Sequence, residues 1–226
     1  MSDIKIGDFP LFIEKGAKIE CSFINCTKGP VYIDENVVVH AHTRLEGPLY
    51  IGKNSVVLGG NIRHSSIGDH CKVHGEISNS VFSSYSNKAH EGFVGHSYIG
   101  SWVNLGAQTT TSNLKNNYSL VSVELEGKKV NTDCQFLGSI IGDYVKTAIG
   151  TCFNTGSIIH CGSDIVNHDF FTKYYSPFVW GGNSASTHYE LRKFIITVER
   201  MMSRRQMQLT PNLIDLITLL HKRYTR

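Results

Sequence analysis

Residues 31–58 read VYIDENVVVHAHTRLEGPLYIGKNSVVL, a stretch with strictly regular spacing. An aliphatic residue returns every six positions, at Ile33, Val39, Leu45, Ile51 and Val57. Four residues after several of these stands a small or β-branched residue, as at Val37, Thr43 and Ser55. Helices repeat about every 3.6 residues and strands about every 2, so a six-residue unit with one large and one small inward residue predicts one flat face of a triangular coil.

The same spacing returns farther along the chain after interruptions. A large apolar residue is again followed, four positions later, by a small or β-branched one, starting at residues 67, 99, 105, 141, 153 and 159. Three units make one coil of about 18 residues, and stacked coils share backbone hydrogen bonds and one continuous core. The predicted fold class is an all-β solenoid, a parallel β-helix of hexapeptide repeats with loop insertions and a C-terminal helical appendage.

Two segments interrupt the repeat, residues 78–98 and residues 114–140. In the second, apolar residues on both sides of Glu126-Gly127 predict a β-hairpin. Long insertions into a regular solenoid frequently carry function. The repeat stops after Ile165, and we expect the aromatic stretch 170–182 to cap the open end of the coil.

The domain organisation predicted is a β-helix over residues 1–182 followed by helices over residues 183–226. Thr187 with Glu190 predicts a capping box for a first helix, and Thr210-Pro211 predicts the start of a second. Apolar residues follow helical spacing in both segments. Their stripes either cover the solenoid or join subunits, and the sequence leaves both readings open.

Composition and charge restrict the possible partners. The chain has 226 residues, a net charge of +3 and 41% hydrophobic residues, values typical of an ordinary globular protein. Basic residues are scattered except for the pairs Arg204-Arg205 and Lys222-Arg223, so no nucleic-acid partner is predicted. No apolar run approaches the roughly 20 residues of a membrane span, and no signal-like segment opens the chain, so no membrane partner is expected.

The six cysteines contain no C-x-x-C pair, and several stand where small core residues are expected. We interpret them as reduced, buried thiols, which predicts a cytoplasmic protein.

The densest group of polar residues lies in residues 86–95 and 104–113. His90 is separated from Asn104 by 14 positions and from Asn113 by 23. In coils of about 18 residues, we expect these three side chains to lie on adjacent turns near one cleft. Histidine titrates near neutral pH and is therefore suited to take a proton from an amine that attacks a thioester.

The segments 104–118, NLGAQTTTSNLKNNY, and 177–182, PFVWGG, carry a resemblance to a known family. Over roughly residues 5–182, the chain resembles the hexapeptide-repeat acyltransferases. It is most similar to the acetyltransferase domain of bifunctional N-acetylglucosamine-1-phosphate uridyltransferase/glucosamine-1-phosphate acetyltransferase, in a divergent bacterial branch. The resemblance implies a left-handed β-helix, a homotrimer with sites between subunits, and acetyl transfer from acetyl-CoA to an amino-sugar phosphate.

The resemblance also implies residue roles. His90 matches the general base, Asn104 and Asn113 match asparagines that orient substrates, and Ala107 matches a backbone contact to the acyl carrier. We expect Thr109, Lys146 and Gly150 to join Ala107 in binding acetyl-CoA. The substrate-binding set that we expect is completed by Phe93, Lys115 and Tyr118 and by three basic candidates for the phosphate, Lys88, Arg63 and Lys72.

Two positions depart from the family pattern. Phe93 and Leu114 stand where the family has tyrosines, with Lys115 and Tyr118 as nearby substitutes. These departures put the identity of the acceptor in doubt. The chain is either a stand-alone acetyltransferase or one half of a bifunctional enzyme, and the sequence leaves both open.

Other functions remain as alternatives. One is acetyl transfer to a nucleotide-linked amino sugar, and another is a non-catalytic trimerisation or nucleotide-sugar-binding module. A zinc hydratase on the same fold would need three converging histidines. His64, His70 and His74 are spaced by six and four residues, which does not match that family's ligand pattern, so no metal is predicted.

Overall fold

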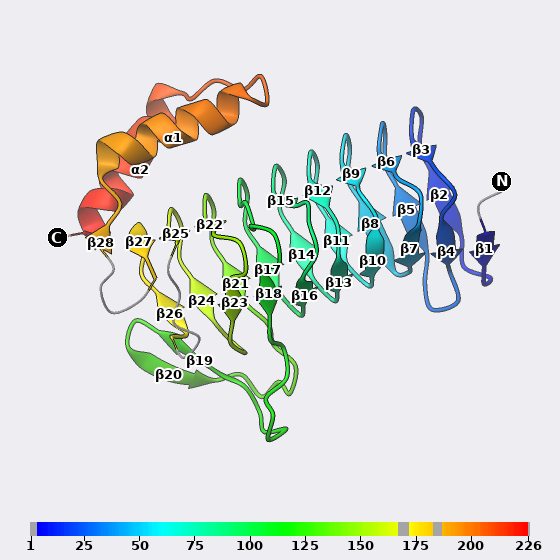
Figure 1. Ribbon diagram of the computed structural model, residues 1–226, viewed down its shortest axis with the longest axis horizontal. Helices are drawn as coiled ribbons and strands as arrows, with labels where there is room; N and C mark the ends of the chain where they lie inside the picture. Colours follow the sequence, from blue (N-terminus) through cyan, green and yellow to red (C-terminus); the bar gives the residue numbers. More distant parts are fainter. Residues whose placement is uncertain (1–3, 167–171, 183–186, 226) are drawn as a thin grey trace.

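The computed structural model describes residues 4–166, 172–182 and 187–225. The chain winds into a parallel β-helix of about ten turns, with two helices toward the C-terminal end (Figure 1). The coil is left-handed, so the predicted fold class is confirmed. Each turn adds one strand to each of three flat sheets, called here faces A, B and C in the order in which the chain visits them.

Face A opens each turn. Its main sheet contains β1 (Ile4–Ile6), β4 (Phe23–Asn25), β7 (Thr43–Glu46), β10 (Gly60–Arg63), β13 (Glu76–Ser78) and β16 (Phe93–Gly95). Two later strands extend the face, β18 (Thr110–Thr111) and β23 (Cys152–Phe153).

Face B is the longest sheet, with nine parallel strands. They are β2 (Leu11–Ile13), β5 (Val31–Ile33), β8 (Leu49–Ile51), β11 (Ser66–Ile67), β14 (Val81–Phe82), β17 (Tyr98–Ile99), β21 (Ile140–Ile141), β24 (Ile158–Ile159) and β26 (Tyr174–Tyr175).

Face C closes each turn. It contains β3 (Lys18–Ile19), β6 (Val38–Val39), β9 (Val56–Val57), β12 (Lys72–Val73), β15 (Asn87–Lys88), β22 (Lys146–Thr147), β25 (Asp164–Ile165), β27 (Val179–Gly181) and β28 (Thr187–His188). The bridges Asn87 to Asn104 and Asn104 to Lys146 connect its two halves. β28 alone runs antiparallel, against β27.

The core consists of inward side chains stacked from coil to coil. On face B, Ile33, Ile51 and Ile67 are register partners and are fully buried. Removing one such side chain from water contributes about 1.5–3 kcal/mol. Because every coil repeats the arrangement, the six-residue spacing of the sequence becomes one continuous column.

Buried serines connect successive coils where face A turns into face B. The N–H of Ser80 donates to Oγ of Ser65, and the N–H of Ser97 donates to Oγ of Ser80, both at 3.1 Å. The N–H of Ser139 continues this row to Ser97 at 2.9 Å. A buried N–H without an acceptor costs about 1–3 kcal/mol, so these hydroxyls stabilise corners that the sheets leave unpaired.

The predicted interruption at residues 78–98 is wrong, because β14, β15, β16 and β17 continue all three faces in register. The coils there are shorter than 18 residues. Register partners are 18 residues apart at Val31 and Leu49, but 15 apart at Ser66 and Val81. Corner residues with positive φ, such as Asn79 at 51°, turn the chain in fewer residues.

The excursion predicted at residues 114–140 is confirmed. Tyr98 and Ile140 are register partners although 42 residues separate them. Within the excursion, β19 (Ser122–Leu125) and β20 (Lys128–Asn131) form the antiparallel hairpin around Glu126-Gly127.

The aromatic stretch 170–182 does more than cap the coil, and its residues 170 and 171 lie outside the described part. Tyr174 pairs with Ile158 on face B, and Trp180 pairs with Asp164 on face C. The stretch therefore adds further strands to the solenoid. Residue 183, where the predicted domain boundary falls, also lies outside the described residues.

The two helices are α1 (Leu191–Ser203) and α2 (Pro211–Tyr224). The predicted capping box is wrong, because Thr187 lies in β28 and the N-cap residue Glu190 makes no side-chain capping bond. Pairing of β28 with β27 removes Thr187 from the helix start. The cap of α2 is confirmed, since the Thr210 hydroxyl accepts from the N–H of Leu213.

The helices cover the solenoid along the corner between faces B and C. Phe194, Val198 and Met202 lie on one side of α1 and are buried in a second apolar cluster with Trp102 and Phe178. Along this corner the rings of His70, Tyr85 and Trp102 are stacked, with centroids 4.7 and 4.3 Å apart. Of the two readings left open, the structure therefore supports packing on the solenoid.

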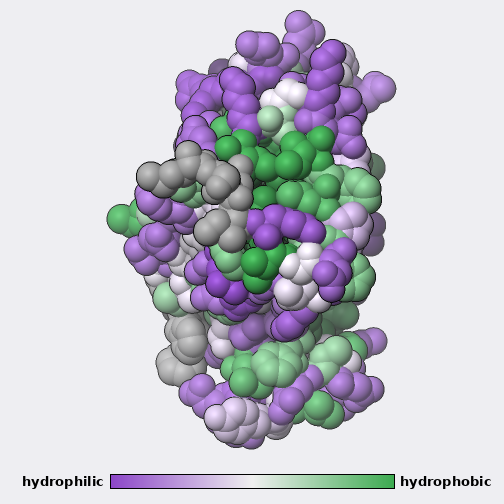
Figure 2. Space-filling model, turned by 90° about the vertical axis from the view of Figure 1, so that its right-hand side faces the viewer, coloured by the Kyte–Doolittle hydropathy of each residue, from purple (hydrophilic) through white to green (hydrophobic). Residues whose placement is uncertain are grey.

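Apolar side chains gather at the N-terminal end of the solenoid, onto which Figure 2 looks. Ile6, Phe9, Phe12 and Ile13 are each between 40% and 50% exposed. No coil precedes them among the described residues, so the first turn lacks a stacking neighbour on this side.

The cysteines are free thiols, as predicted, but only Cys26 and Cys71 are buried. Cys21 and Cys134 are exposed, so the expectation of uniformly buried thiols is wrong. In the described part of the chain, neither helix is long and apolar enough to cross a membrane.

Phe194→Ala should loosen the packing of the helices on the solenoid. Phe194 is 1% exposed, and replacing a buried phenylalanine by alanine costs about 3–5 kcal/mol. Urea denaturation followed by tryptophan fluorescence should report the loss, because Trp102 lies in the same cluster. Leu219→Ala on the exposed side of α2, where Leu219 is 66% exposed, is the control and should change the stability by less than about 0.5 kcal/mol.

Candidate functional site

His90 lies on the loop that leads from β15 on face C to β16 on face A. Its side chain is exposed at the rim of the coil. Gly92 in the same loop has φ of 127°, and a Cβ there would lie 2.2 Å from the carbonyl oxygen of Thr109. The loop therefore needs glycine to approach the next coil while it presents His90 to solvent.

Lys88 supports this loop from inside the coil. Its side chain is fully buried in a column where Val57 and Val73 stand in the preceding coils. The ammonium donates to the carbonyl oxygens of His90 and, at 2.8 Å, of Glu91. Burial lowers the pKa of Lys88 to about 8, although the negative charge of Glu91 opposes the shift. The structure thus places this predicted phosphate ligand beneath the loop and away from solvent.

The neighbours of the His90 loop come from the coils on both sides. Nδ1 of His74, in the preceding coil, lies 3.4 Å from Oε1 of Glu91. In the next coil, the N–H of Gln108 donates to the carbonyl of Glu91 at 2.9 Å, which places Ala107 beside His90.

The residues expected to bind acetyl-CoA separate into accessible and buried positions. The N–H of Gly150 donates to the carbonyl of Ala107 at 2.7 Å, so these two positions lie on successive coils at the His90 corner. Lys146 pairs with Asn104 on face C. Thr109 is fully buried, and its hydroxyl lies 2.7 Å from that of Thr147, so its side chain is a core contact.

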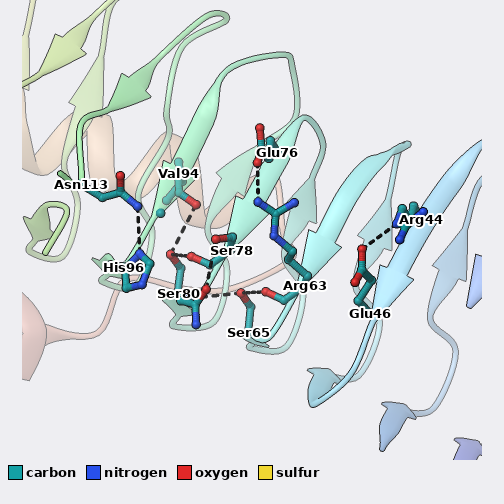
Figure 3. A network of polar contacts seen from close by, with 12 residues as sticks. Arg44, Glu46, Arg63, Ser65, Glu76, Ser78, Ser80, Val94, His96 and Asn113 are labelled. Atoms are coloured by element: carbon teal, nitrogen blue, oxygen red, sulfur yellow. Dashed lines mark hydrogen bonds and ion pairs between the residues drawn. The ribbon is translucent and has the colours of Figure 1, made fainter. Parts of the chain in front are cut away.

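Asn113 lies at a different corner from His90, where face A turns into face B. Its Nδ2 atom is 2.9 Å from Nδ1 of His96, and Phe136 stacks on the His96 ring (Figure 3). For the amide to donate, Nδ1 must be unprotonated. Burial lowers the pKa of His96 and so favours this neutral form.

Phe93 belongs to the same group as Asn113. A Cβ added to Gly95 would lie 2.3 Å from the Phe93 ring and 2.8 Å from Nδ2 of Asn113, so both side chains lie over this glycine. The expectation that His90, Asn104 and Asn113 meet in one cleft is therefore not met within a single chain. A distance of 23 residues is one 17-residue coil plus a further six residues, which span a whole face.

The other predicted substrate residues are engaged locally. Arg63 forms an ion pair with Glu76 at 2.6 Å on face A (Figure 3). Lys115 donates to the carbonyl of Leu120 and to the hydroxyl of Ser119 within its own loop. Tyr118 is 68% exposed on this loop, and Lys72 is exposed on face C.

The three histidines considered for zinc lie at three different corners. His64 follows β10, His70 precedes β12 and His74 follows β12. Within the described residues, no group of three potential metal ligands comes together.

Sequence reasoning missed three residues near the site. His96 carried a usable signal, since it stands one 17-residue coil before Asn113. Asn87 and Arg205 had no such signal, because the 118 positions between them follow no repeat.

This architecture, a left-handed hexapeptide β-helix with an exposed histidine on a corner loop, agrees with the acyltransferase class that the motifs indicated. The resemblance to the bifunctional uridyltransferase and acetyltransferase proteins is confirmed by sequence comparison. The chain is 34% identical over 107 residues to the Bifunctional protein GlmU of Methanococcus maripaludis strain C5, which covers 47% of this chain and 24% of that protein. No family model matches the chain.

A second relative is the Bifunctional sugar-1-phosphate nucleotidylyltransferase/acetyltransferase of Sulfurisphaera tokodaii, 35% identical over 36% of this chain and 20% of that protein. The chain thus spans less than a quarter of the length of these relatives. A solved UDP-N-acetylglucosamine acyltransferase is 16% identical with a TM-score of 0.37, and the alignment covers 90% of this chain and 82% of that one. At this score the likeness adds nothing to the strand registers described above.

Lys88→Met should change how stability depends on pH. The Lys88 pKa is about 8 in the folded protein and near 10.5 in the unfolded chain, so between these values the unfolded state binds more protons. The stability of the wild type should therefore rise relative to the variant between pH 8 and 10.5, by at most about 3 kcal/mol. Urea denaturation at pH 7, 8.5 and 10 measures the difference, and a constant difference would contradict a buried ammonium.

Proposed function

We propose that the protein is an acetyl-CoA-dependent N-acetyltransferase that acts on an amino-sugar phosphate such as glucosamine 1-phosphate. The observation that carries the proposal is the exposed His90 on a loop held by Lys88, at the rim of a hexapeptide β-helix. The relative from Sulfurisphaera tokodaii, named as a bifunctional nucleotidylyltransferase and acetyltransferase, supports it. Free thiols support a cytoplasmic location.

In the proposed reaction, His90 accepts a proton from the amino group of the sugar as the nitrogen attacks the thioester carbonyl. The new C–N bond forms, the C–S bond breaks, and the thiolate of CoA takes the proton from His90. The amide of Asn104 and backbone N–H groups at the Ala107 corner are the donors proposed for the oxyanion. The fixed loop matters because a general base acts only within hydrogen-bonding reach of its proton.

The proposed enzyme is a homotrimer in which the His90 corner of one copy lies against the Asn113 corner of its neighbour. Support comes from the separation of these two groups by the full width of face A in one chain. A closed cyclic assembly places one surface of each copy against a different surface of the next, as such a shared site requires. Phe93 and His96 then belong to the Asn113 half of each site.

His90→Ala should abolish acceptor-dependent thiol release from acetyl-CoA. Loss of a general base lowers kcat by about 10²–10⁴-fold. The assay should include glucosamine 1-phosphate, glucosamine and a nucleotide-linked amino sugar, so that it also identifies the acceptor class. His188→Ala, at an exposed histidine of β28, is the control and should retain activity. Absence of release with every acceptor would favour a non-catalytic binding module.

Mixing two inactive variants tests the shared site. His90→Ala and Asn113→Ala, dissociated and reassembled in equal amounts, should recover about a quarter of wild-type activity, since each interface acquires both intact residues with probability one half times one half. Each variant reassembled alone is the control and should remain inactive. If both residues served the same site from one chain, mixing would restore nothing.

A further inference from the structure

The outward side of face C carries a row of polar residues that runs along the axis of the solenoid. The row consists of Lys72, Asn87, Asn104 and Lys146, each the register or bridge partner of the next. Adjacent members are about 4.8 Å apart, the usual spacing of neighbouring strands. Lys72 and Asn104 are exposed, and Asn87 and Lys146 are half-buried.

The connection between α1 and α2 brings a third cation to this row. Nη2 of Arg205 donates to Oδ1 of Asn87 at 2.9 Å, across 118 positions of sequence. The Tyr85 hydroxyl lies 3.8 Å from Sδ of Met207 in the same connection. The helices therefore hold Arg205 over face C as well as covering the corner.

Arg205 fixes the direction of the hydrogen bonds in the row. A guanidinium only donates, so the oxygen of the Asn87 amide must face it. The nitrogen of Asn87 then points to Asn104, whose Oδ1 lies 3.5 Å away. With its oxygen on that side, Asn104 has its NH₂ group left to donate to a ligand.

The charges of the row are not neutralised by close acids. Within the described part of the chain, Lys72, Lys146 and Arg205 have no carboxylate within 4.0 Å. Lys146 donates only to the carbonyl of Tyr144, at 3.3 Å, and its register partner Asp164 follows in the next coil. Three cations and two amide groups thus form one donor-rich strip.

We propose that Arg205, Lys72, Asn87, Asn104 and Lys146 form a binding site for the phosphate groups of a ligand, completed by the C-terminal helices. The strip lies three residues from His90 along one strand, or roughly 10 Å, which is within reach of a ligand whose reacting atom is at His90. The phosphate belongs either to the acyl donor or to the acceptor. This inference deepens the proposed function and rests on it for the identity of the ligands.

Calorimetric titration of the full chain with CoA and with glucosamine 1-phosphate tests the strip, with pantetheine and glucosamine as phosphate-free counterparts. Arg205→Gln should weaken binding of at least one phosphorylated probe about tenfold, since a charge-assisted hydrogen bond contributes about 1.5–3 kcal/mol. The probe that loses affinity identifies the source of the phosphate. Arg204→Gln, at the exposed neighbour, is the matched control and should bind both probes like the wild type.

Lys72→Gln separates ligand binding from attachment of the helices, because Lys72 is exposed and lies on the solenoid. It should weaken the same probe about threefold while tryptophan fluorescence stays unchanged. Wild-type affinity for both phosphorylated probes in Arg205→Gln and Lys72→Gln would overturn the strip, as would no binding by the wild type.

Thiol release measured on the same preparations separates the two proposals. Turnover that is equal in wild type and both variants at low substrate concentration leaves acetyl transfer standing and overturns the strip. Loss of phosphate binding in the variants of a protein that shows no turnover supports the strip and contradicts acetyl transfer.

Discussion

Each coil of this protein depends on the backbone hydrogen bonds and stacked side chains that it shares with the coils on either side. A single coil has neither a closed sheet nor a core of its own. The register of one turn therefore constrains the next, and corner residues such as Ser80 matter because they pair the amides that the flat sheets leave over. The positions of His90 and Asn113 follow from the same constraint, since each is carried at a fixed corner of the coil.

The regular part of the fold could be predicted because a column of inward residues leaves a direct trace in the sequence. Ile33, Ile51 and Ile67 each stand at the large apolar position of a six-residue unit. The coils of residues 60–104 were harder, because a corner turned by one residue of positive φ shortens the coil and shifts the spacing. The start of α1 was missed for another reason: Thr187 pairs in a strand, and tertiary pairing overrides a local capping pattern.

The candidate site divides in the same way. Spacing placed Ala107 and Gly150 correctly relative to His90, because all three occupy equivalent positions on successive coils. It misplaced Asn113, since the residues left after one full coil carry the chain across a whole face. Lys88 was assigned to a ligand because lysines usually contact solvent, although it stands in a column of valines, which is the signal for an inward side chain.

The unequal coils have an evolutionary consequence. Because a corner can lose two or three residues while the flat faces stay in register, as between Ser66 and Val81, length changes at the rim need not be matched by changes in the interior. Insertions and deletions can then accumulate at the corners while the stacked columns stay nearly constant. A lineage built on such a scaffold can alter the residues that its rim presents to small molecules without having to evolve a new core.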